Sequence, residues 1–272
     1  MRGKGILIYA LLFAITVVTF SPFVLSILGS LKDTRSILAW PPQIFSPPFH
    51  PENYVRVWKA SPLFPVWVRN SIVLALITVA VKLLSCSMAG YAFARMRFPG
   101  RNVFFWVTLA TMMVPYAVTL VPNYTIMAKF GWIDTYLPLI VPGISDAFGV
   151  FLMAQFFKTL PRDYEDAARI DGASWFTIFW RVMLPLARPA LVALAIFKFQ
   201  ASWNDFLGPL IYLNSPAKFT LPLGLNFFKG QYFHFWELIL AGAMFNAVPM
   251  LVIFVIFQRY FIKGISLGGL KA

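Results

Sequence analysis

The fold of this 272-residue chain is decided by apolar stretches such as SIVLALITVAVKLLSCSMAGYAFA, residues 71–94. An α-helix rises 1.5 Å per residue, so about 20 apolar residues cross a hydrocarbon core of about 30 Å. Six stretches reach that length: Gly5–Leu28, Ser71–Ala94, Asn102–Leu120, Leu137–Phe157, Pro189–Pro209 and Phe235–Phe261. The sequence therefore predicts an all-α polytopic membrane protein with six transmembrane helices.

The composition agrees with a membrane protein, because 60% of the residues are hydrophobic, 12% are charged and the mean hydropathy is +0.74. Soluble domains contain about 25% charged residues. The net charge of +13 fits basic cytoplasmic loops and anionic lipid headgroups, so no nucleic-acid partner is expected. Cys86, the single cysteine, excludes an internal disulfide, and with only His50 and His234 beside it we expect no metal site.

The basic residues predict the orientation of the chain. With the N-terminus inside, 13 of the 23 Lys and Arg residues lie in cytoplasmic segments and eight lie outside. The short loop Arg95–Arg101 is the most basic, and short loops weigh most in this rule. The first span follows Arg2 and Lys4 but exceeds the apolar core of a secretory signal and lacks a clear cleavage site, so we expect it to be retained. Both termini are predicted to be cytoplasmic.

The whole chain, residues 1–272, is expected to form a single transmembrane domain of six helices. An external segment, residues 32–70, is rich in Pro and Trp, and its part Glu52–Lys59 predicts a short interfacial helix. A cytoplasmic loop, residues 158–188, lies between the fourth and fifth spans.

This cytoplasmic loop contains PRDYEDAARIDGAS, residues 161–174. Pro161 and the acidic residues after it suit a helix N-terminus, and Gly172 suits the C-terminal stop. Glu165 and Arg169 have the favourable i, i+4 spacing for an ion pair. A second amphipathic stretch, Trp175–Leu184, follows. We predict a short exposed helix built for docking.

The loop resembles a known family. Glu165-x-Ala167-Ala168-x-x-x-Gly172, followed after nine residues by Val182-x-Leu184-Pro185, is similar to the EAA loop of permease subunits of bacterial ABC importers. Asp171-Gly172-Ala173 resembles the form found in the maltose-type, carbohydrate-uptake branch. Trp203-Asn-Asp-Phe206 and the tail Gly264–Lys271 resemble that branch too. The family pattern usually has Ile at position 182 and often Ala at position 166.

The resemblance implies the type I ABC importer permease fold in the bacterial cytoplasmic (inner) membrane. It also implies four kinds of partner: a second homologous permease, two ATPase subunits or domains, an external solute-binding protein and membrane lipid. Sugar would be imported by alternating access. The residues expected at the ATPase contact are Glu165, Ala167, Ala168 and Gly172, with Arg169 and Asp171 beside them.

The chain is not expected to be an enzyme. It lacks the phosphate-binding motif G-x-x-x-x-G-K-[ST] and any nucleophile–base pair in a plausible loop. We therefore expect no cofactor on this chain, no catalytic residue, and ATP and Mg²⁺ used by the partner ATPase.

Three charged residues fall inside predicted spans: Lys82, Asp146 and Lys198. A charge at bilayer depth costs at least about 2.5–3.5 kcal/mol, so such side chains usually face protein or water. They form either a structural pair or part of the substrate path. Two lysines against one aspartate would suit an acidic solute, of the uronide oligosaccharide or glycerol phosphate type.

Aromatic and hydrogen-bonding side chains occur together at the outer ends of two spans, a mixture that suits the apolar faces and hydroxyl edges of sugars. These further candidates for the substrate path are Trp203, Asn204, Asp205, Tyr116, Asn123 and Tyr124. The alternative is an interfacial aromatic belt that needs no substrate.

Two other function classes compete with an importer subunit. A stand-alone secondary transporter would favour inverted repeats or paired broken helices, and neither is visible in the sequence. A membrane-embedded enzyme would need carboxylate or histidine clusters that the sequence lacks.

Overall fold

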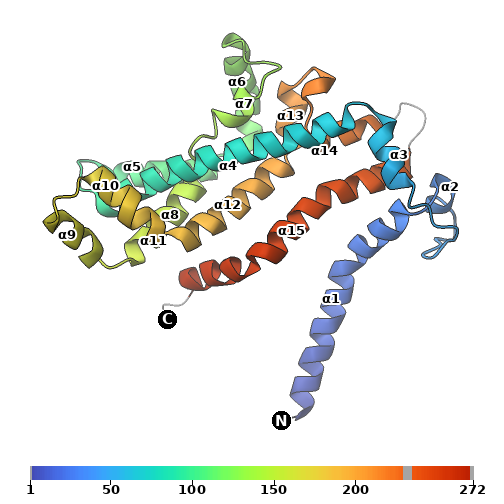
Figure 1. Cartoon of the computed structure of the whole chain (residues 1–272), viewed down its shortest axis with the longest axis horizontal. Coiled ribbons are helices and arrows are strands. Elements are labelled where there is room, and N and C mark those ends of the chain that lie inside the picture. Colours follow the sequence, from blue (N-terminus) through green and yellow to red (C-terminus); the bar gives the residue numbers. More distant parts are fainter. Residues whose placement is uncertain (1, 229–234, 270–272) are drawn as a thin grey trace. The chain divides into compact units, whose positions relative to one another are not determined.

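A computed structural model describes residues 2–228 and 235–269, and these residues form helices with no strand among them (Figure 1). They divide into two compact units. The first comprises Met1–Trp67 and Leu221–Pro249, and the second comprises Val68–Thr220 and Met250–Ala272. Lys229, His234 and the last residues of the tail, including Lys271, lie outside the described residues.

The first unit is held together by aromatic rings and one buried amide. Its helices are α1 (Arg2–Ser30), α2 (Thr34–Ile37), α3 (Asn53–Ala60), α14 (Leu221–Leu225), the beginning of α4 (Phe64–Arg95) and the first part of α15 (Trp236–Gly269). Phe64 packs edge-on against Trp58, Trp67 and Phe245. Asn53, fully buried, donates to the carbonyls of Ser30 and Lys32 and so satisfies the C-terminal end of α1. The helix predicted in the external segment is confirmed as α3.

The second unit contains most of α4 and a series of shorter helices. These are α5 (Arg101–Ala110), α6 (Tyr116–Lys129), α7 (Leu137–Ile140), α8 (Ala147–Thr159), α9 (Asp163–Ile170), α10 (Trp175–Ile178), α11 (Leu184–Leu186), α12 (Arg188–Trp203) and α13 (Leu207–Tyr212). A π-helical turn, Phe179–Met183, joins α10 to α11. The predicted amphipathic stretch after Ser174 is therefore helical throughout.

The apolar stretches form helices, but not all of them are straight spans. Within the described residues, three helices are long and apolar enough to cross a membrane: Ile8–Ser30, Phe64–Arg95 and Trp236–Gln258. The number rises to five if each of two bent helix pairs is one span. The third predicted span is broken, with an angle of 101° between Arg101–Met113 and Tyr116–Lys129. Pro115 explains the break, because proline has no N–H and forces the preceding residue out of the helical region. The third predicted span, residues 102–120, thus corresponds to a bent pair of helices, and the bend lies at Pro115 within its predicted bounds.

The fourth and fifth spans are also shorter than predicted. The fourth corresponds to α8, a 13-residue apolar helix that begins only after Asp146. The fifth corresponds to α12, which follows Trp175–Leu186 at an angle of 78°.

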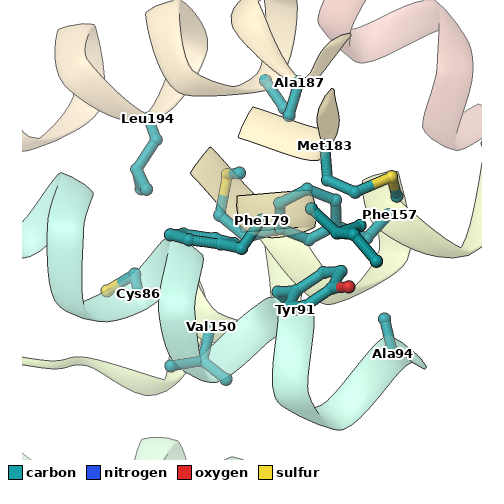
Figure 2. Close-up of a cluster of buried hydrophobic side chains, with 12 residues drawn as sticks. Cys86, Tyr91, Ala94, Val150, Phe157, Phe179, Met183, Ala187 and Leu194 are labelled. Carbon is teal, nitrogen blue, oxygen red and sulfur yellow. The ribbon is translucent and has the colours of Figure 1, made fainter. Parts of the chain in front are cut away.

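The core of the second unit joins the spans to the cytoplasmic loop (Figure 2). Figure 2 shows Tyr91 and Phe179 meeting inside the cluster, and their ring centroids are 5.3 Å apart. Gly90 lets α4 approach α8 closely, because a Cβ there would lie 2.6 Å from that of Met153. Ala168 of α9 packs against the same cluster. The loop helix α9 therefore packs against the same cluster as α4, α8 and α12.

Asp134, in the turn before α7, connects two loops of the second unit. One carboxylate oxygen accepts the backbone N–H groups of Asn214 and Ser215, at 3.0 and 2.9 Å. The other accepts the Ser215 hydroxyl at 2.6 Å and Lys218 Nζ at 2.9 Å. These hydrogen bonds, with that of Ser215 the strongest, hold the pKa of Asp134 well below its usual range.

We expect Asp134→Asn to lower the thermal stability of the purified protein at pH 7. The pKa of an Asp in the unfolded chain is about 3.9, and that of the folded carboxyl is lower. The contribution of the carboxylate to the free energy of unfolding is therefore complete above about pH 4 and is lost as the pH falls through the folded pKa. The Tm gap between parent and variant should therefore be constant from pH 7 to 5 and narrow below about pH 4. Thermal unfolding at pH 7, 5 and 3.5 checks this, and a gap independent of pH would exclude a role for the charge.

Candidate functional site

The cytoplasmic loop folds as predicted around α9. Three acidic side chains occupy the first turn, where they complement the positive end of the helix dipole. Gly172, with φ of 78°, ends the helix: its N–H donates to the carbonyl of Arg169, and the N–H of Ala173 donates to that of Ala168, both at 2.9 Å. This pair of bonds is a Schellman motif, which requires a left-handed residue at Gly172.

Glu165 is buried, contrary to the exposed position that the sequence suggests. Its side chain is 5% exposed, and its Oε2 atom lies 3.9 Å from Nη1 of Arg95, which is 4% exposed. The predicted pair between Glu165 and Arg169 does not form. Arg169 instead pairs with Asp166 at 3.7 Å and stacks over the ring of Trp175 at 4.0 Å. Glu165 points inward because it lies, with Ala168, on the face of α9 that packs against the core of the second unit.

Arg95 connects three helices. It is the last residue of α4, and its Nη2 atom donates to the carbonyl of Phe157 at 2.6 Å and to that of Leu160. Both carbonyls lie at the C-terminal end of α8, where helix carbonyls have no partner within the helix. With Glu165 on α9, Arg95 thus holds the ends of two spans and the loop helix in one contact. From the sequence, Arg95 is only one of the basic residues that predict the orientation of the chain.

The other face of α9 is open. Ile170 is 87% exposed and Tyr164 is 50% exposed, and Phe176 on α10 is 66% exposed. Ala167, Asp171 and Gly172 are exposed beside them, whereas Ala168 is half-buried. An isoleucine so exposed, on a loop outside the spans and among other apolar side chains, is typical of a protein contact surface. Ile170 could not be identified from the sequence, because it is not one of the positions of the EAA-loop motif.

The three charged residues of the spans lie together. Asp146 Oδ1 accepts Lys198 Nζ at 2.7 Å, and Asp146 Oδ2 lies 3.6 Å from Lys82 Nζ. Oδ1 of Asp146 also caps α8 by accepting the N–H of Gly149. Both lysines thus share the carboxylate of Asp146.

The remaining candidates for the substrate path differ in their surroundings. Tyr116 interacts electrostatically with Asp205 and Tyr212, and the ring of Tyr124 stacks on that of Tyr212 with centroids 6.3 Å apart. Tyr212, buried at the centre of this group, was not identified from the sequence. Trp203 is buried with its ring stacked on Phe199, so it presents no free aromatic face in this chain.

Asn204 and Asn123 differ in position. Asn204 is exposed at the end of α12, and its amide donates to the carbonyl of Gln200 at 3.1 Å. Asn123 is half-buried within α6. Among the described residues no group of His, Cys, Asp and Glu could hold a metal ion.

Comparisons with known proteins agree with this arrangement. Residues 83–267 match the family model described as "Binding-protein-dependent transport system inner membrane component". The chain is 39% identical to the arabinooligosaccharides transport system permease protein AraQ of Halalkalibacterium halodurans, over 81% of this chain and 79% of that protein. It is 30% identical to the sn-glycerol-3-phosphate transport system permease protein UgpE of Yersinia enterocolitica, over 97% and 96%.

A solved structure has the same fold. The crystal structure of a bacterial ABC transporter involved in the import of the acidic polysaccharide alginate superposes with a TM-score of 0.85 at 22% identity, covering 96% of this chain and 97% of that one. The fold is thus that of a type I ABC importer permease. The chain belongs to the family of binding-protein-dependent transport system inner membrane components, the permease subunits of ABC transporters.

Proposed function

We propose that this chain is the transmembrane subunit of an ATP-driven importer that carries a sugar or sugar derivative into the cytoplasm by alternating access. The proposal rests on the two faces of α9. The exposed face presents Ala167 and Ile170 to a partner, whereas on the buried face Glu165 contacts Arg95. Force applied to the exposed face would reach the spans through that contact.

The proposed assembly supplies what the chain lacks. A second, homologous permease completes the substrate path, and two ATPase subunits bind ATP and Mg²⁺ below the loop. An external solute-binding protein delivers the substrate, which agrees with the family description. ATP binding closes the ATPases, the docked loops move together, and the path opens outward.

We expect both termini and α9 on the cytoplasmic side. In a Cys86→Ser background, Lys218→Cys should react with an impermeant thiol reagent applied to intact cells, because Lys218 lies in a predicted external loop. Ser174→Cys should react only after permeabilisation. The reverse pattern would contradict the orientation inferred from the basic residues.

The names of the relatives favour a sugar as the substrate of this chain, but they also allow an acidic solute. AraQ is named for arabinooligosaccharides, whereas UgpE is named for sn-glycerol 3-phosphate. An acidic solute is our second candidate, and it rests on Lys82 and Lys198 at Asp146. A sugar remains the first choice because the chain is 39% identical to AraQ and 30% identical to UgpE.

Separate Lys82→Met and Lys198→Met variants of the assembled transporter distinguish the two candidates. If an acidic solute is carried past Lys82, Lys82→Met should lower uptake of an anionic saccharide about tenfold or more, since close charge pairs at an interface couple by at least about 1.5 kcal/mol. Uptake of a neutral saccharide should be unchanged. Lys198 makes the shorter contact with Asp146, so Lys198→Met should weaken assembly of the transporter more than Lys82→Met does. Full uptake with unchanged preference in both variants excludes the acidic solute.

The proposed function is tested by co-expressing the chain with the proteins encoded beside it and reconstituting the purified assembly in vesicles. ATP-dependent sugar uptake that requires an external binding protein is expected. Uptake by this chain without any ATP-hydrolysing subunit would contradict the proposal.

A further inference from the structure

The loop between α4 and α5 contributes to a cavity of about 510 Å³ that the transport mechanism does not use. Arg97 of this loop and Arg101, the first residue of α5, line it, and Arg162, directly before α9, completes it. Phe98 and Val103 form its apolar walls. We call it the arginine cavity.

The charge of the arginine cavity is uncompensated. None of the described residues that line it is acidic. The adjoining cavity, of about 350 Å³, shares Arg97 and Arg162 but also contains Glu165 and Asp166. Arg101 is oriented by Asn102 at 3.3 Å and by the carbonyl of Met96 at 3.2 Å. None of the three guanidinium groups forms an ion pair among the described residues, and together they create a site for an anion.

The position of the cavity identifies the anion. A loop of five residues, 96–100, joins α4 to α5, so Arg97 and Arg101 come directly after the C-terminal end of the candidate span Phe64–Arg95. The face of α5 beside the cavity is apolar and open: Val103 is 65% exposed, Phe104 59% and Trp106 68%. A soluble phosphate would use the arginines but not this face, whereas a phospholipid uses both.

We propose that the arginine cavity binds the phosphate of an anionic phospholipid. Arg97, Arg101 and Arg162 donate to the phosphate oxygens, and the acyl chains run along the exposed face of α5. Because Arg162 directly precedes α9, the bound lipid also holds the start of the loop helix at the membrane surface.

The test uses the assembled transporter in nanodiscs that contain phosphatidylglycerol and phosphatidylcholine. After extraction in mild detergent, retained lipid is counted by mass spectrometry. The parent should retain phosphatidylglycerol preferentially. Arg97→Gln/Arg101→Gln should retain roughly 25-fold less, since each of the two arginines near anionic lipid contributes about a fivefold factor. Arg97→Lys/Arg101→Lys should fall between, because lysine lacks the bidentate geometry.

Arg181→Gln/Arg188→Gln is the matched control, since it removes two exposed arginines that do not line the cavity. It should retain lipid like the parent. Equal loss in this control, or no preference for phosphatidylglycerol in the parent, would overturn the proposal. Complete displacement of the lipid by millimolar inorganic phosphate would also overturn it, because the site would then be one for a soluble anion.

Discussion

Glu165→Gln is expected to uncouple ATP hydrolysis from transport, lowering sugar uptake per ATP by a factor of about 5 to 150, the usual range of a coupling free energy. The substitution keeps the shape of the side chain but removes the charge that faces Arg95, whose side chain is 4% exposed. A buried pair that loses one partner costs about 3–5 kcal/mol, so α9 should separate from the end of α4. Uptake and ATPase activity of the reconstituted assembly are measured in parallel.

The control is a double-mutant cycle with Arg95→Met. If the two residues act through their contact, the double variant should lose no more coupling than Arg95→Met alone. Arg95→Met should itself be more harmful to assembly, because Arg95 also binds the carbonyls of Phe157 and Leu160. Additive losses in the double variant would show that Glu165 acts elsewhere.

Ile170→Glu is expected to abolish association with the ATPase while leaving the membrane subunit folded. Ile170 is 87% exposed, so a charged side chain there disturbs no internal packing. At the centre of a docking surface, loss of one apolar anchor costs about 2 kcal/mol or more, which weakens binding at least about 30-fold. Co-purification of the ATPase measures the effect.

Ile170→Leu serves as the matched variant, because it preserves an apolar side chain of the same size. It should bind the ATPase at nearly the parental level. If Ile170→Glu retains the ATPase as well as Ile170→Leu does, the exposed face of α9 is not the docking surface.

Much of the fold could be predicted because the lipid environment simplifies it. Apolar length alone locates α1, α4 and α15, and the turn chemistry around Pro161 and Gly172 locates α9. Apolar length could not predict the break at Pro115, because a proline inside a span is often tolerated, as Pro122 is within α6.

The side-chain contacts of the site were harder to predict. The i, i+4 spacing of Glu165 and Arg169 suggested a local pair, but the buried face of α9 brings Glu165 to Arg95, 70 positions away in the sequence. Tertiary burial outweighs a surface pair worth only about 0.2–0.5 kcal/mol. By contrast, the cost of charges at bilayer depth predicted that Lys82, Asp146 and Lys198 face protein or water, and the three side chains lie together at Asp146.

Cross-linking from Ala167 tests the central claim most directly. In a Cys86→Ser background, Ala167→Cys places a thiol on the exposed face of α9, next to Ile170. In the assembled transporter a short bifunctional thiol reagent should join it to an ATP-hydrolysing subunit, with a yield that changes when ATP is added. The account is contradicted if the same reagent joins Ala167→Cys to no ATPase while an intact, active assembly is present.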